Sequence, residues 1–273
     1  MIGSVFSPYY AWSGRHNPHN FNGLNVGLYG KGVKRWTLTE RSNRSLKQAE
    51  AKLNIGPSHL EWDGAALCVT VDEWAVPFPR KVRGELRIIP EGVNETAFSL
   101  DRAGRHQWCP IAPKCRIEAR FDQPSLRFSG HGYIDSNWGS EPLEAAFSHW
   151  DWSRAPLKNG AGLLYDAFET DGTNRQLALA FKNNGTFEQA APPKRQTLRR
   201  CPIWRMPRTT LADDAVQPRI QQTQEDTPFY SRSWLDTEFQ GERTLAVHES
   251  LDLKKFANPI VRRMLPFRMP RWG

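Results

Sequence analysis

The chain has 273 residues, enough for one large domain or two small ones with a substantial core. No apolar run approaches the roughly 18–20 residues of a membrane-spanning helix, which excludes an integral helical membrane protein. The formal net charge of +8 favours anionic partners, such as lipid headgroups or nucleic acid, although such a charge more often serves solubility. The 11 Trp, 14 Phe and 6 Tyr suit β-sheet cores or an apolar ligand.

The local pattern predicts β structure along most of the chain. Alternating residues around Asp63-Gly64 predict a hairpin, because Asp-Gly tolerates the positive φ values of a tight turn. The spacing of about ten residues between many turn signals favours a barrel or a sandwich. The predicted strands are Ser58–Trp62, Ala66–Asp72, Arg83–Ile89, Cys115–Phe121, Leu126–Gly130, Ala161–Glu169, Gln176–Phe181 and Thr244–Leu253.

Helices are expected in two places. Leu46–Leu53 has the composition of a short helix that ends before Gly56-Pro57. A second helix is expected after Ser140, which would cap it, with Pro142 in its first turn. The basic and apolar residues of the tail, Arg262–Gly273, fit either a packed segment with solvated arginines or contact with an anionic membrane.

Several kinds of site are disfavoured by the sequence. Cys68, Cys109, Cys115 and Cys201 are scattered, which predicts neither a zinc site nor a disulfide framework. His16 and His19 flank a proline, so they would not share a helical face for metal binding. No nucleotide-binding glycine loop or Gly-x-Ser-x-Gly elbow occurs. The first residues lack the pattern of a signal peptide, so a cytoplasmic protein is expected.

Ionisable and aromatic residues are densest between His106 and Trp152. His106 and Trp108 are two residues apart, as are Tyr133 and Asp135, so each pair would share one face of a strand. Taken alone, Asp135 fits a turn-capping carboxylate at least as well as a catalytic group, and the tryptophans fit a core.

The sequence resembles the carotenoid 1,2-hydratases, or hydroxyneurosporene synthases, of purple photosynthetic bacteria. The resemblance is carried in order along nearly the whole chain. Its stretches are GSVFSPYYAW (3–12), LNVGLYG (24–30), TERS (39–42), IGPSHLEWDG (55–64), DRAGRHQWCPIAP (101–113), GYIDSNWGSEPLEAAFSHWDWSRA (132–155), EDTPFYSRS (225–233) and VHESLDLKKFANPIVRRMLPFRMPR (247–271).

The resemblance implies an all-β fold of two tandem lipocalin-like antiparallel β-barrel domains, expected at 1–118 and 119–273, with the active site where they meet. Family members usually carry an aromatic-rich strand before Gly3–Trp12. If the chain starts at Met1, the first barrel is expected to lack its opening strand and to expose an edge.

The resemblance also implies hydration of the C1=C2 double bond in the ψ-end group of an acyclic carotenoid, without redox cofactor or metal. Asp135 is the expected acid, and Tyr133 orients either Asp135 or the water. Trp108 faces the C1 cation, and His106 takes a proton from the attacking water. The partners are then the carotenoid, in a deep apolar tunnel, and water, with peripheral contact to anionic membrane and no nucleic acid. Substrate-wall residues are expected at Trp138, His149, Trp150 and Trp152.

Three other functions remain open at this point. A lipocalin-like barrel could carry a carotenoid or lipid without reacting it. A related enzyme could act on another terpenoid or on a polyketide, because a fold does not fix a function. Nucleic-acid binding ranks last, because the basic residues are dispersed and no recognised module is present.

Overall fold

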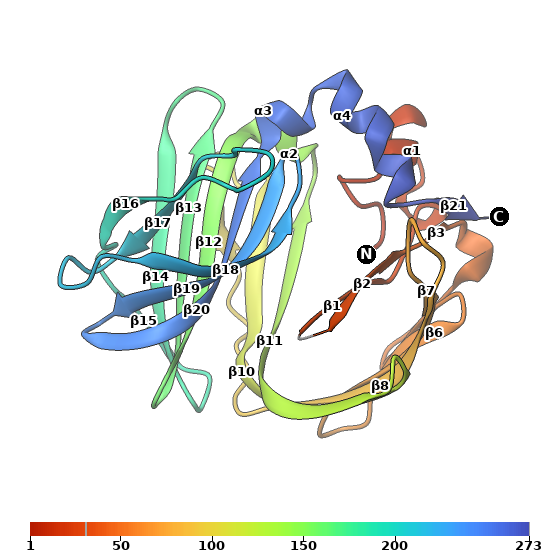
Figure 1. Ribbon diagram of the computed structural model, residues 1–273, viewed down its shortest axis with the longest axis horizontal. Coiled ribbons are helices and arrows are strands. Elements are labelled where there is room, and N and C mark those ends of the chain that lie inside the picture. The colour runs from red at the N-terminus through yellow and green to blue at the C-terminus, as the bar shows by residue number, and fades with distance from the viewer. Residues whose placement is uncertain (31, 273) are drawn as a thin grey trace. The chain divides into compact units, whose positions relative to one another are not determined.

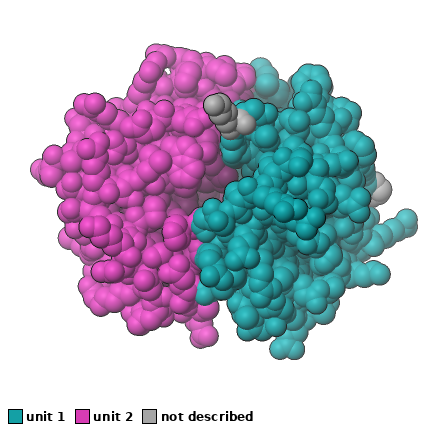
Figure 2. Space-filling view, turned by 60° about the horizontal axis from the view of Figure 1, so that its bottom comes forward, with its two compact units in different colours: residues 1–90, 116–130, 259–273 teal, residues 91–115, 131–258 magenta. Residues whose placement is uncertain are grey.

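The computed structural model describes residues 1–30 and 32–272, and their regular structure is mostly β-strand (Figure 1). The expected all-β fold is confirmed, with sheets of antiparallel strands. The chain divides into two compact units, coloured separately in Figure 2. Unit 1 comprises residues 1–90, 116–130 and 259–273, and unit 2 comprises residues 91–115 and 131–258.

Unit 1 is built on a sheet with the strand order β11-β10-β8-β7-β6-β5-β4, in which β10 spans His106–Gln123 and β11 spans Leu126–Gly139. A β1–β2 hairpin packs on this sheet. Its core joins Leu28 of the hairpin to Val71, Val82 and Phe121 of the sheet. The elements of unit 1 are α1 (Pro8–Trp12), η1 (Pro18–Asn20), β1 (Asn25–Gly30), β2 (Val33–Leu38), β3 (Glu40–Arg41), η2 (Asn43–Ser45), β4 (Leu46–Ala49), β5 (Lys52–Ile55), β6 (Ser58–Trp62), β7 (Leu67–Trp74), β8 (Lys81–Pro90), α4 (Pro259–Met264), η3 (Leu265–Phe267) and β21 (Arg271–Trp272), which pairs in parallel with β3.

The hairpin predicted around Asp63-Gly64 is confirmed as β6 and β7. The Asp63 carboxylate accepts the backbone N–H groups of Ala65 at 2.9 Å and Ala66 at 2.8 Å, which closes the turn. Gly64 has a φ of +94°, a conformation that side-chain-bearing residues rarely adopt.

The helix predicted over Leu46–Leu53 is wrong, because this segment forms the β4–β5 hairpin. Leu46 pairs with Ile55 and Gln48 with Leu53, and β5 then pairs with β6. Helix propensities differ by only a few tenths of a kcal/mol per residue. The ladder of hydrogen bonds along an existing sheet outweighs so small a preference.

The second predicted helix is present as α2 (Leu143–Ala146), but it is short and its predicted cap is wrong. Pro142 occupies the N-cap position and no side chain caps the helix. The backbone N–H of Ser140 donates instead to the carbonyl of Arg105 at 3.1 Å.

Unit 2 is built on a sheet with the strand order β15-β14-β13-β12-β20-β19-β18, beside a small β16–β17 sheet. One core joins Ala155, Leu164 and Leu235 of the large sheet to Leu211 of β17. The elements of unit 2 are β9 (Phe98–Ser99), α2, β12 (Phe147–Leu157), β13 (Gly160–Glu169), β14 (Asn174–Lys182), β15 (Phe187–Gln189), β16 (Lys194–Leu198), β17 (Arg208–Ala212), β18 (Arg219–Asp226), β19 (Tyr230–Phe239), β20 (Glu242–Asp252) and α3 (Leu253–Phe256).

Two long strands, β10 (His106–Gln123) and β11 (Leu126–Gly139), contribute residues to both units. The domain boundary predicted near residue 118 falls inside β10, and the division into 1–118 and 119–273 stays a prediction. In the part of the chain that is described, no helix is long and apolar enough to cross a membrane.

Candidate functional site

Trp108, Tyr133 and Asp135 form one hydrogen-bonded cluster in unit 2. The indole Nε1–H of Trp108, on β10, lies 3.0 Å from Asp135 Oδ2 and 3.1 Å from the Tyr133 hydroxyl, and it donates to both. Asn137 Nδ2 donates to the same Asp135 oxygen at 3.2 Å. Tyr133, Asp135 and Asn137 occupy alternate positions of β11, so the strand places all three side chains on one face.

The pKa of the Asp135 carboxyl is set by its surroundings. Its pKa is raised above the ordinary value because surrounding protein atoms partly desolvate the carboxyl, and the negative charge of Glu249 adds to this rise. Hydrogen bonds from Trp108 and Tyr133 stabilise the carboxylate and oppose the rise in pKa. Asp135 nevertheless keeps accessible surface. The cluster therefore combines an acid of raised pKa with an open side.

Trp108 is the aromatic centre of the cluster, and its side chain has no exposed surface. Its ring centroid lies 5.9 Å from that of Phe98 and 5.4 Å from that of Tyr165. Packing against these two rings holds the indole in place, with its N–H directed to Asp135. The structure thus gives Trp108 a positioning contact with the carboxyl.

Two of the four predicted wall residues, Trp150 and Trp152, lie beside this cluster. They occupy alternate positions of β12 and share a face. The ring of Trp152 lies 5.4 Å from that of Tyr133, and the ring of Trp150 lies 5.7 Å from that of Tyr165. Trp152 is half-buried, so part of its ring is accessible to a ligand.

The other two predicted wall residues lie elsewhere. His149 points to the opposite face of β12 and stacks on Phe168 at 3.9 Å. Trp138 alternates to the face of β11 opposite Asp135 and is 51% exposed.

His106 is not in contact with Asp135 among the interactions of the described residues. Its Nε2 lies 3.6 Å from Glu141 Oε1, and its ring packs 5.0 Å from Phe147. It sits beside Gly139, where a Cβ would lie 2.7 Å from His106 Nδ1. Gly139 and Asp135 are four residues apart on β11, which separates them by roughly 13 Å at 3.3 Å per residue. Burial lowers the pKa of His106, which favours the neutral imidazole.

A second polar cluster, which sequence reasoning missed, surrounds Asp151 on the other face of β12. Its carboxyl accepts a hydrogen bond from Ser250 and one from the Thr209 hydroxyl at 2.6 Å. Burial raises the pKa of Asp151 to about 7, against the effect of these hydrogen bonds. His248 Nε2 lies 2.7 Å from the Thr209 carbonyl, and burial lowers the pKa of His248 to about 4. In the sequence, the position of Asp151 between Trp150 and Trp152 was the one sign that could have pointed to this cluster.

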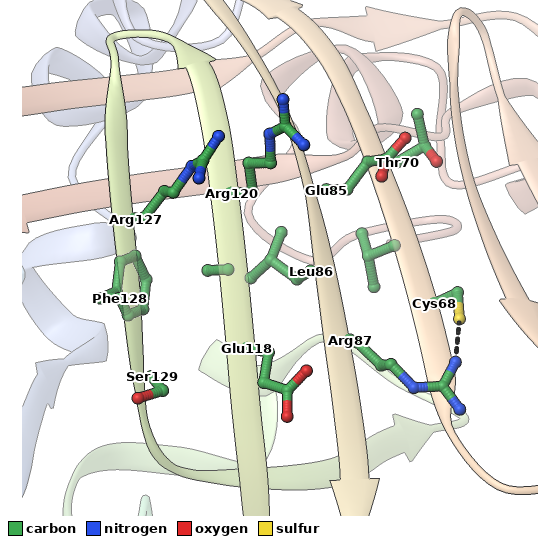
Figure 3. A pocket seen from close by; sticks show the side chains of 12 residues that line it. Cys68, Thr70, Glu85, Leu86, Arg87, Glu118, Arg120, Arg127, Phe128 and Ser129 are labelled. Atoms are coloured by element: carbon green, nitrogen blue, oxygen red, sulfur yellow. Dashed lines mark hydrogen bonds between the residues drawn. The ribbon is translucent and has the colours of Figure 1, made fainter.

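A groove of about 630 Å³ lies in unit 1 and contains none of the predicted site residues. Figure 3 shows its side chains in rows across β7, β8, β10 and β11. One row is Thr70, Glu85, Arg120 and Arg127, and another is Cys68, Arg87, Glu118 and Ser129. Charged side chains of both signs line this groove, so it differs from the apolar tunnel expected at Asp135. That tunnel stays a prediction. No group of three His, Cys, Asp or Glu in residues 1–30 and 32–272 is arranged to hold a metal ion.

The fold is similar to that of a lipocalin-like protein described as AttH, from Nitrosomonas europaea. The two structures superpose with a TM-score of 0.56 at 11% sequence identity, over 81% of this chain and 78% of the other. The expected lipocalin-like architecture is confirmed by this similarity.

Sequence comparison identifies the family. The chain is 53% identical to the acyclic carotenoid 1,2-hydratase of Thiocapsa roseopersicina, over 100% of this chain and 68% of that protein. It is 44% identical to the Rubrivivax gelatinosus protein of the same name, over 99% of this chain and 68% of that protein. For the Cereibacter sphaeroides protein of that name the identity is 41%, over 99% of this chain and 96% of that protein. The sequence model of the carotenoid hydratase CrtC family matches residues 1–273. This chain belongs to the carotenoid hydratase CrtC family.

Proposed function

We propose that the protein is a hydro-lyase that adds water to the C1=C2 double bond in the ψ-end group of an acyclic carotenoid such as neurosporene or lycopene. Membership of the family and the names of its relatives support this reaction. The observation that carries the proposal is Asp135, an exposed residue whose carboxyl has a raised pKa and accepts a hydrogen bond from Trp108. The scheme uses side chains and water, without metal or redox cofactor.

In this scheme Asp135, as the neutral acid, gives its proton to C2, and the π electrons form the new C–H bond. The tertiary cation at C1 accepts a lone pair of water, which forms the C1–O bond. Loss of a proton from this oxygen leaves a tertiary alcohol. General acid catalysis of this kind contributes about 10²–10⁴-fold.

Two groups are candidates for the proton that the water loses. His106, our predicted base, is neutral near pH 7 because burial lowers its pKa. The second candidate is the carboxylate of Asp135, which is formed in the first step. If it accepts the proton from the water, the neutral acid is restored. The contacts of His106 with Glu141 and Phe147 favour Asp135 for this role. A His106→Gln variant that retains most activity would identify Asp135 as the acceptor.

The aromatic residues have separate parts in the proposal. Tyr133 orients the carboxyl of Asp135. The contact between Trp108 and the C1 cation stays a prediction; in the structure the Trp108 ring exposes no surface, and its indole N–H contacts Asp135. Trp152 offers an accessible ring beside Tyr133, and a cation–π contact there is worth about 2 kcal/mol when desolvated.

The proposal is tested by incubating purified protein with lycopene in oxygen-18 water and examining the pigments by mass spectrometry. We expect a 1-hydroxy product that carries oxygen-18. Asp135→Asn should reduce its formation by at least about 100-fold. The matched control is Asp122→Asn, which changes an exposed carboxylate on β10 and should retain full activity. Full activity of Asp135→Asn would exclude this acid, and stoichiometric pigment binding without product would favour a carrier.

A further inference from the structure

The C-terminal segment of unit 1 turns an apolar stripe toward solvent. Ile260 and Met264 of α4 and Phe267 of η3 are 68%, 40% and 73% exposed. Their spacing of four and three residues places them on one side of the helical segment. Apolar stripes on the helices of soluble proteins normally face the core, so exposure of this stripe indicates a surface that is covered in use.

The segment that carries the stripe is basic. Residues 259–273 contain four arginines and no Asp or Glu. Arg263, within α4, is exposed beside the stripe. Exposed apolar groups next to cationic side chains, without nearby acidic residues in the segment, match the interface of an anionic lipid bilayer.

The segment that follows is firmly attached to unit 1. Arg271 makes an ion pair of 2.7 Å with Glu40, and β21 pairs with β3. The Arg268 guanidinium lies 4.6 Å from the ring centroid of Trp36, and Met269 is buried. These contacts hold the end of the stripe in place, so its exposure is a property of folded unit 1.

We propose that Ile260, Met264 and Phe267 form a docking surface for an anionic lipid bilayer. The three side chains enter the boundary between headgroups and acyl chains, and Arg263 meets lipid phosphates. A second copy of this chain is the less favourable occupant, because a twofold contact across the stripe would bring the two Arg263 side chains together. Lipid binding is independent of the proposed reaction, although a polyene substrate would reside in such a bilayer.

The test is co-sedimentation with vesicles of phosphatidylglycerol and phosphatidylcholine, compared with phosphatidylcholine alone. The double variant Ile260→Ser/Phe267→Ser should bind the anionic vesicles at least about tenfold more weakly. Arg263→Gln should weaken binding about fivefold, and 0.5 M NaCl should weaken the wild type similarly. Leu245→Ser is the matched control, since Leu245 is an exposed apolar residue of β20 paired with Asp236, and it should bind like the wild type.

Circular dichroism and size-exclusion chromatography check that each variant is folded and report its oligomeric state. Equal vesicle binding by the double variant and the wild type would refute the docking surface. A wild-type dimer that the double variant converts to a monomer would assign the stripe to self-association and also refute it. Hydration of detergent-solubilised lycopene should be unchanged in the double variant, which separates this test from that of the proposed function.

Discussion

Replacement of Asp151 by Asn should stabilise the protein increasingly as the pH rises. In the folded state the carboxyl has a pKa of about 7, raised by burial, whereas its ordinary value is 3.8. Between these two pH values the unfolded chain has lost a proton that the folded chain still holds. Ionisation therefore favours unfolding, and this penalty is absent below about pH 4 and complete above about pH 7.

The magnitude follows from the two pKa values. Each unit corresponds to 1.36 kcal/mol, so a difference of roughly 3 units makes a full penalty of about 4 kcal/mol. At pH 5 the penalty is about 2 kcal/mol, and at pH 8 it is about 4 kcal/mol. Asn carries no ionisable proton, and its altered hydrogen bonds to Ser250 and Thr209 add an offset that does not depend on pH.

Urea unfolding of wild type and Asp151→Asn at pH 5 and pH 8 measures this penalty. The difference in unfolding free energy should shift by at least about 2 kcal/mol in favour of the variant at pH 8. Leu211→Val, a neutral change in the adjoining core, should give the same difference at both pH values. A shift below about 0.5 kcal/mol for Asp151→Asn would refute the assignment of a buried, weakly acidic carboxyl.

Two further predictions concern stability. Arg41→Met should lower the free energy of unfolding in urea by about 3–5 kcal/mol, because it removes the cation 2.7 Å from the fully buried Glu73 carboxylate. The double variant Arg41→Met/Glu73→Gln should recover most of this loss. Equal stabilities of the single and double variants would contradict the reasoning. Gly160→Ala should lower the melting temperature sharply, because its Cβ would lie 1.7 Å from the Phe181 carbonyl oxygen, whereas Gly172→Ala meets no atom within 4 Å and should cost less. A milder effect at Gly160 than at Gly172 would be inconsistent with the close contact.

Local signals predicted the fold where neighbouring residues decide it. Asp63 and Gly64 close their hairpin with atoms from within the turn, so the sequence was sufficient there. Leu46–Leu53 has a helical composition, but its hairpin depends on pairing with β6, a partner supplied by the rest of the sheet. Strand pairing of this kind competes with the helix propensity of the segment, and the eight residues Leu46–Leu53 alone do not show it.

The site was predictable to the extent that strand alternation determines it. Tyr133 and Asp135 share a face, as their spacing predicts. Trp108, 27 residues before Asp135 in the chain, also contacts them, and only the family resemblance placed it with this pair. Asp151 stands between two recognised tryptophans, yet its partners Thr209 and Ser250 are 58 and 99 residues distant. A pattern within β12 could not reveal a network assembled from three strands.

The continuity of β10 and β11 restricts how this protein can be recombined with its relatives. A crossover between residues 108 and 135 would take Trp108 and its carboxyl partner from different parents, and a crossover within either strand would join two halves of that strand from different parents. Residues 259–273 return to the unit formed by the first ninety residues, so both ends of a chimera must come from one parent. An exchanged stretch that runs from residue 91 to residue 258 keeps β10 and β11 whole, but it also brings residues 116–130 of unit 1 from the second parent.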